Sequence, residues 1–393
     1  MTRPGHSSGG FDAARCGSAS ARTSRAASPG ASNTPERSRH ERPRSRLAPV
    51  GALHAEGNIM NDTLTRAAQS VLADLCTPQF VRGVETAHDR RAGHALWCQL
   101  DERGLLDALV PRAQGGADLP LAAAAGVLFA FGQHALPLPA AHTMIARHLL
   151  AAAQLDAPRG PIALAIADAS QCTAFVPYGQ VADAVVVETA KGVWLVPLDT
   201  ARVEKHGDGL DATVCFSTRT ARALPACSIA ELGAMITAAT MAGAMQRVLD
   251  VTTAWVREST QSAASQAGRD TTQRQLDAIA AHVAATRTAA QQGCAAHRSG
   301  EQRLASAIAK ARASRAAPLV ANGAHGLAGA LGIVPEFDLQ LFTRRLHAQR
   351  LQFGSESFWD EIVCTHAQGR SHGLADDASG IFDALDEAAT AAH

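Results

Sequence analysis

The spacing of apolar residues divides the chain into three stretches. From Asp62 to about Leu155 apolar residues recur at helical spacing, in segments such as LTRAAQSVLADL and LAAAAGVLFAFGQHAL, and the interruptions are proline or glycine. From Pro161 to about Leu224 the segments are short, β-branched and bounded by turn residues, which is typical of strands. From Ser228 onward, alanine-rich stretches with few breakers predict long helices.

These changes of period also predict the domain boundaries. We expect an N-terminal helical domain over 60–158, a small and mostly antiparallel β domain over 159–226, a C-terminal helical bundle over 227–365 and a loose tail over 366–393. The bundle is expected to contain four helices, because three long helical stretches precede a shorter amphipathic one. The predicted fold class is mostly α with a small β domain.

Residues 1–59 differ in composition from the rest. They are rich in Arg, Ser, Gly and Pro and nearly free of large apolar side chains, so they cannot bury enough surface to offset the entropy of ordering. We expect this leader to be disordered. It lacks the apolar core of a secretory signal and the amphipathic face of a transit peptide. Since a capped amphipathic helix follows Met60, we predict that the natural product starts there; recovery of a native product that retains Arg15 would contradict this.

Composition excludes several classes of protein. Of the 393 residues, 47% are hydrophobic and 18% charged, which fits a globular protein, and the formal net charge of zero argues against nucleic acid or a membrane surface as partner. The eight cysteines form no C-x-x-C pair, so we expect reduced thiols in a cytoplasmic protein. The sixteen histidines show no metal-ligand spacing such as H-E-x-x-H, and we expect no metal site.

The stretch from Ala324 to Trp359 carries the strongest pattern. Gly326, Gly329 and Gly332 recur every three residues, which on a helix predicts an edge without side chains, where another backbone or a cofactor can approach closely. The following helix has an apolar face and a basic C-terminal half, formed by Phe337, Leu339, Leu341, Phe342 and Leu346 and by Arg344, Arg345 and Arg350.

This stretch resembles the C-terminal helical domain of the acyl-CoA dehydrogenase family, which reads Q-x-x-G-G-x-G-x-T-x-E, then a helix with paired basic residues, then E-G-T. The matching positions are Gly329, Ala330, Gly332, Glu336, Arg344 and Gly354. The N-terminal part is similar to the same family, in a helix that ends in a Gly-Leu turn before a P-x-x-x-G-G loop, at Trp97, Leu100, Gly104, Leu105, Pro111, Gly115 and Gly116. The resemblance implies the three-part family fold over Met60 to Val363.

The resemblance also places the catalytic base, and here the chain departs from the family. Phe353 occupies the slot before Gly354 where many members carry the catalytic glutamate, and its ring cannot accept a proton. Some members place the base on the first bundle helix, near Gly233 here, where Glu231 is two residues off. Glu356, about one turn beyond the usual slot, is the remaining candidate base; the alternative interpretation is a solvated carboxylate at a helix start.

The cofactor positions are altered as well. The resemblance implies FAD binding by Gly326, Gly329, Ala330, Gly332, Gln261 and Ser355. Members also carry Y-x-x-x-R-x-Q-F-G after the first bundle helix, with an arginine that reaches the FAD pyrophosphate across a subunit interface. Here the aligned text is WVRESTQSA, so Ser259 replaces that arginine. The T-E-P-x-A-G-S-D loop that touches the flavin ring in the family has no counterpart in the shortened β segment.

Two functions remain open. The first is α,β-dehydrogenation of an acyl-CoA thioester by an FAD flavoprotein, as one subunit of a heteromer with a homologous acyl-CoA dehydrogenase subunit or as a homo-oligomer. The second is a catalytically silent, flavin-free assembly subunit that completes a partner chain's active site. The acyl group is not encoded in any one residue, although a shortened β domain rich in alanine would fit a cavity widened for ring-bearing substrates. The pair Arg344 and Arg345 would serve a subunit interface or form a solvated basic face.

Overall fold

The computed structural model describes residues 50–368, apart from positions 88, 89, 169, 171, 207, 208, 261–265 and 335. The chain divides into two units, Met1–Gly57 and Asn58–His393. Helix α1 (Val50–Leu75) starts ten residues before Met60, within the leader that was expected to be disordered. Positions 1–49 of the leader and the tail beyond 368 lie outside the described residues, and the start at Met60 stays a prediction.

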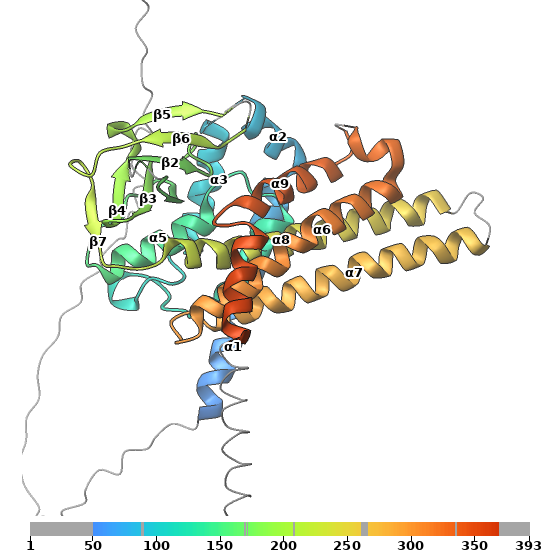
Figure 1. Cartoon of the computed structure of the whole chain (residues 1–393), viewed down its shortest axis with the longest axis horizontal. Helices are drawn as coiled ribbons and strands as arrows, with labels where there is room; N and C mark the ends of the chain where they lie inside the picture. The colour runs from blue at the N-terminus through green and yellow to red at the C-terminus, as the bar shows by residue number, and fades with distance from the viewer. Residues whose placement is uncertain are drawn as a thin grey trace, which may run out of the picture. The chain divides into compact units, whose positions relative to one another are not determined.

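The N-terminal part of the second unit is helical, as the apolar spacing predicts (Figure 1). Its further elements are α2 (Pro78–Ala87), α3 (Arg90–Glu102), the short 3₁₀ helix η1 (Arg112–Gln114), α4 (Leu121–Gln133) and α5 (Ala140–Ala152). Helix α3 ends in the Gly-Leu turn that the resemblance implied: Gly104 has φ of 69° and the Leu105 amide bonds back to the Leu100 carbonyl.

The β domain consists of two small sheets. One has the order β1-β3-β4-β7 and the other β2-β6-β5; β1 and β3 are parallel and the remaining pairs are antiparallel. The strands are β1 (Ile162–Ile166), β2 (Thr173–Val176), β3 (Ala184–Thr189), β4 (Gly192–Pro197), β5 (Arg202–Lys205), β6 (Ala212–Cys215) and β7 (Arg222–Leu224), with the 3₁₀ helix η2 (Leu198–Thr200) between β4 and β5. The apolar pattern did not predict β5, because all four of its residues are exposed.

The C-terminal part is a helical bundle. Figure 1 shows the long helices α6 (Ile229–Thr260), α7 (Gln266–Ala295) and α8 (Gln302–Ala328) packed side by side, followed by η3 (Gly329–Ile333) and α9 (Leu339–Leu351). One more helical segment covers residues 356–368. Helix α4 packs closely on α6, because a Cβ at Gly132 or Gly243 would overlap the backbone of the facing helix. The predicted fold class, mostly α with a small β domain and a C-terminal bundle, is confirmed.

The glycine-spaced stretch at the end of α8 is not the single helix edge that the spacing predicted. Helix α8 ends at Ala328, and Gly329 caps it with φ of 60°. Gly332 then turns inward and packs against His325 and Ala328. A glycine with positive φ is a common way to stop a helix, and here it ends the three-residue register after Gly326.

No helix among the described residues is both long and apolar enough to cross a lipid bilayer. Within the same residues, His, Cys, Asp and Glu side chains form no group of three or more that could hold a metal ion.

Candidate functional site

The two positions where the resemblance places a catalytic base lie in contact with each other. The turn after α9 places the Phe353 ring directly over Gly233 on α6, where a Cβ would overlap the ring. Phe353 is 7% exposed and has φ of 54°, a conformation that a bulky residue rarely adopts. Neither residue carries a group that accepts a proton, so the place of the base is occupied by a hydrocarbon ring.

His142 on α5 packs edge-on against two aromatic rings. Its centroid lies 5.6 Å from the Phe353 ring and 5.6 Å from the Tyr178 ring. The Leu164 amide donates to its Nδ1 at 3.2 Å, and burial lowers the pKa of His142 to about 3, so the imidazole is neutral. We call His142, Tyr178 and Phe353 the aromatic plug; its members come from the N-terminal helices, the β domain and the C-terminal part.

Tyr178, the chain's one tyrosine, follows β2 with φ of 60°. Its hydroxyl is buried near Arg345 on α9, and burial raises the pKa of the phenol. The Arg345 guanidinium donates to the Leu136 carbonyl at 2.5 Å and to Glu85 at 2.5 Å. Arg344 pairs with the same carboxylate at 3.0 Å. Both arginines therefore have a partner on α2 of their own chain, and Arg345 does not belong to a solvated basic face.

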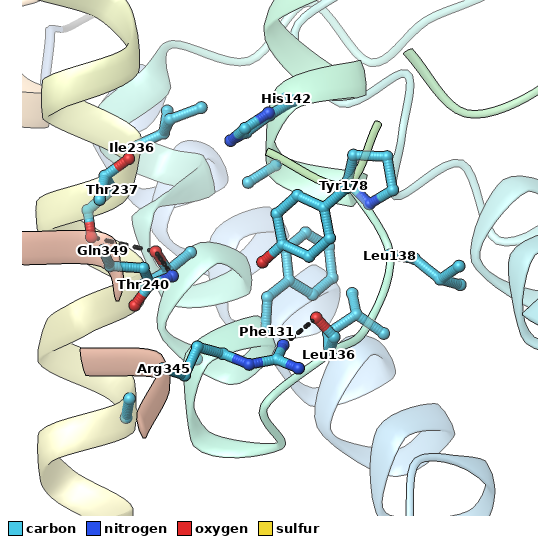
Figure 2. Close-up of a pocket in the computed structure, with 14 residues that line it drawn as sticks. Phe131, Leu136, Leu138, His142, Tyr178, Ile236, Thr237, Thr240, Arg345 and Gln349 are labelled. Carbon is cyan, nitrogen blue, oxygen red and sulfur yellow. Dashed lines mark hydrogen bonds between the residues drawn. The ribbon is translucent and has the colours of Figure 1, made fainter. Parts of the chain in front are cut away.

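The space left between these groups is very small. Figure 2 shows the Tyr178 hydroxyl and the Arg345 guanidinium facing a cavity of about 20 Å³. That volume holds about one water molecule. The cavity is lined by Phe131, Gly132, Leu136, Leu138, Pro139, Ala141, His142, Tyr178, Ile236, Thr237, Thr240, Ala244, Arg345 and Gln349. Aromatic and aliphatic side chains from three parts of the fold fill this position, and the widened acyl cavity stays a prediction.

The candidate base Glu356 is engaged elsewhere. Arg350 Nε donates to its two carboxylate oxygens at 3.0 and 3.1 Å, and a third bond comes from Arg350 Nη2. The hydrogen bonds from Arg350 lower the pKa of Glu356, which makes the carboxylate a weaker proton acceptor. A catalytic role for Glu356 stays a prediction, and this ion pair argues against it.

The residues assigned to FAD binding separate into two groups. Gly326, Gly329 and Ala330 are exposed at the end of α8, and a Cβ at either glycine would meet nothing within 4 Å. Ser355 lies beside Gly354, whose carbonyl accepts from Lys310 in the first half of α8. Lys310 precedes Gly326 by a helical length of about 24 Å, at 1.5 Å per residue. Gly332 is buried, and Gln261 lies outside the described residues.

A groove of about 420 Å³ runs along the outer side of Phe353. Its lining is mostly apolar and contains no basic residue: Ile166, Ala167, Glu188, Thr189, Ala190, Ala230, Phe353, Gly354 and Phe358. The one charged member, Glu188, accepts from the Ala230 amide at 3.0 Å at the start of α6. This groove therefore offers no basic group to an anionic phosphate, and FAD binding by the chain stays a prediction.

Residues 228–366 match the family model described as acyl-CoA dehydrogenase, C-terminal domain. This match covers the whole bundle, including the turn that carries Phe353. The C-terminal part of the chain is therefore similar to the C-terminal domain of acyl-CoA dehydrogenases. No curated protein matches its sequence.

Solved structures of acyl-CoA dehydrogenases share the fold. A variant of the Tcur3481-Tcur3483 steroid ACAD has 21% identity and a TM-score of 0.69, over 80% of this chain and 99% of that one. The ChsE4-ChsE5 complex from Mycobacterium tuberculosis has 17% identity and a TM-score of 0.65, over 78% and 97%. A glutaryl-coenzyme A dehydrogenase in complex with glutaryl-CoA has 16% identity and a TM-score of 0.60, over 79% and 95%. At these identities the likeness establishes the fold.

Sequence reasoning missed most of the aromatic plug. It identified Phe353 as a lost base but did not anticipate His142 or Tyr178, which lie 211 and 175 positions away by residue number. The available signal was weak: a single tyrosine in a chain of 393 residues. The contact itself depends on the packing of three parts of the fold.

Proposed function

We propose that this chain is a catalytically silent subunit of a heteromeric acyl-CoA dehydrogenase, which binds no FAD itself and shapes the active site of a homologous partner subunit. The observation that carries the proposal is the Phe353 ring seated on Gly233 against His142. It fills the position where a base would meet the thioester. The plug is built from all three parts of the fold, so it is an integral part of the packed chain.

The chemistry of the family supports this choice between the two open functions. Removal of the proton next to a thioester carbonyl requires a positioned base, and a bound flavin takes the neighbouring hydride. Here Phe353 stands at the family position of the base, Glu356 is held by Arg350, and the groove beside the plug has Glu188 as its one charged residue. These observations support a chain that lacks both a base and a flavin site, which is more than the loss of a single contact.

The structural neighbours support a partner chain. The names Tcur3481-Tcur3483 and ChsE4-ChsE5 each denote a pair of proteins. Gly326 and Gly329 leave open space at the end of α8, where the backbone of another subunit can approach closely. We propose that the acyl-CoA thioester and FAD are bound by that homologous partner, with this chain's α8 end at the interface.

Purification of the chain alone, and co-purification of the natively tagged chain with its partner, tests the proposal. We expect colourless protein alone and a yellow, active complex, followed by the flavin absorbance band and by thioester oxidation with an artificial electron acceptor. Isolated chain that carries stoichiometric FAD and oxidises a thioester would overturn it.

The variant Phe353→Glu restores a carboxylate at the family position and is expected to leave the isolated chain inactive, because the flavin contacts are absent as well. Phe353→Leu is the matched control, since it alters the same buried site without adding a base. Appreciable turnover in Phe353→Glu alone would contradict our proposal that this chain binds no FAD.

A further inference from the structure

A lysine is completely buried beneath the turn that carries the aromatic plug. Lys310 on α8 has no exposed surface, and its Nζ donates to the Arg350 carbonyl at 2.8 Å, the Gly354 carbonyl at 3.0 Å and Ser314 Oγ at 2.8 Å. A lysine is almost never fully buried unless its amine is paired, and here all its partners are neutral oxygens. The burial of this amine therefore calls for a structural explanation.

Two of the three hydrogen bonds, those to the Arg350 and Gly354 carbonyls, span the turn that seats Phe353. Arg350 lies in the last turn of α9, and Phe353 and Gly354 follow with φ of 54° and 103°. Trp359 Nε1 donates to the Phe353 carbonyl at 2.9 Å from the other side. Two consecutive residues with positive φ are held only when the surroundings fix them, and Lys310 bonds to both ends of this turn.

The partners of Lys310 suit an uncharged amine. A neutral amine has two hydrogens, enough for the two carbonyls, and one lone pair, which can accept the hydrogen of the Ser314 hydroxyl. The ammonium form donates all three bonds, and Ser314 then donates to the Arg350 carbonyl at 3.1 Å instead. Each protonation state thus has a complete set of hydrogen bonds, but the second leaves a charge buried among neutral groups.

Burial lowers the pKa of Lys310 to about 7 from the ordinary 10.5; Glu356 raises it and Arg350 lowers it. Arg350 of α9 and Glu356 of the segment 356–368 are the charged groups that act on the amine, and they are paired with each other. The effects of these opposite charges on the pKa of Lys310 oppose each other, so burial is the main influence on that pKa. The amine therefore changes charge close to neutral pH.

We propose that Lys310 is a proton-operated latch: as a neutral amine it locks the turn that seats Phe353 on Gly233, and on protonation it loosens that turn. The direction in which pH changes the opening of the turn follows from proton linkage. When the turn opens and Lys310 meets water, its proton affinity returns to that of a free lysine, so the open form binds the proton more tightly between about pH 7 and 10.5. Opening therefore becomes rarer as the pH rises. This proposal does not rest on the proposed function.

The chain's composition allows a direct test on the unmodified protein. It has three lysines, Lys191, Lys205 and Lys310. With ¹³Cε-labelled lysine, an NMR titration of the full chain resolves each amine, and Lys310→Met assigns the buried one by removing its signal. We expect the Lys310 signal to titrate near pH 7. Titration of that signal above about pH 9.5, close to the value for a free lysine, would overturn the proposal.

Amide hydrogen exchange of the peptide over 351–359 tests the latch itself. After correction for intrinsic exchange, the opening constant of the wild type is expected to fall up to about tenfold per pH unit above pH 7, and that of Lys310→Met to be independent of pH. Arg315→Met is the matched control: it removes an ion pair with Asp360 from the same helix but leaves the three Lys310 bonds in place, and should follow the wild type. Wild-type opening that does not change with pH would contradict the proposal, whatever the stability of Lys310→Met.

Discussion

Gly233 and Gly326 lack side chains in opposite surroundings. At Gly233 in α6 the missing Cβ is replaced by the Phe353 ring, whereas at Gly326 near the end of α8 nothing lies within 4 Å of that position. In the sequence both indicate a close approach to a helix. The structure shows that one approach is already made by the chain itself and that the other position is open. The space over Gly233 is filled from within the chain, whereas the space over Gly326 is open at the surface.

The largest expected effect comes from removal of the ring. Phe353→Ala leaves a cavity over Gly233 and should lower the free energy of unfolding by about 3–5 kcal/mol, as for other buried phenylalanines. Urea unfolding measures this difference in the free energy of unfolding, provided that the wild type and the variant have the same m value. The comparison is sharpened by a double-mutant cycle, because Gly233→Ala should cost nothing further once the ring is gone. An equal cost of Gly233→Ala in both backgrounds would mean that Phe353 does not cover this glycine.

The next effect is the acid stability of the plug. The pKa of His142 is lowered to about 3 by burial, so the unfolded chain binds the extra proton and stability is lost as the pH falls from about 6.5 towards 3. At pH 4 this one residue should account for about 3 kcal/mol, at 1.36 kcal/mol per pH unit. His142→Gln, which keeps an acceptor for the Leu164 amide, should lose less stability than the wild type between pH 7 and pH 4 by urea unfolding. The exposed His366→Gln is the control, and equal losses in all three proteins would contradict the prediction.

The smallest effects compare the two glycines directly. Gly233→Ala introduces a methyl group into the Phe353 ring and should destabilise the isolated chain by about 1–3 kcal/mol. Gly326→Ala adds a methyl group in open space on a helix and should stabilise it by about 0.5 kcal/mol. Thermal unfolding of the two variants checks the opposite signs. If the α8 end meets a partner, Gly326→Ala should also weaken co-purification, and destabilisation of the isolated chain by this change would show that the edge is not open.

The sequence predicted the architecture well because period and composition are local. Helical spacing located the bundle, and short β-branched runs located the β domain, although the entirely exposed strand β5 does not carry that pattern. The predicted glycine edge ends at Gly329, because this glycine adopts a positive φ and stops the helix.

The centre was less predictable because its contacts join distant parts of the chain. Phe353 was identified as a lost base, but no spacing rule connects it to Gly233 or His142. The pairing of Glu356 with Arg350 crosses the turn after α9, where helical periodicity no longer applies. Lys310 lies in an alanine-rich helix, and only the packed structure shows that its amine reaches the carbonyls at the end of α9.

The single tyrosine of the chain is an intrinsic absorbance probe for the opening of the folded structure. Tyr178 lies where the N-terminal helices, the β domain and the C-terminal bundle meet, and its hydroxyl is buried there near Arg345. Because burial disfavours the phenolate, alkaline solution should leave the near-ultraviolet band of tyrosinate undeveloped until that junction separates. After a rapid jump to high pH, the rise in tyrosinate absorbance would therefore measure how fast the N-terminal helices, the β domain and the C-terminal bundle separate around Tyr178. No attached label is needed.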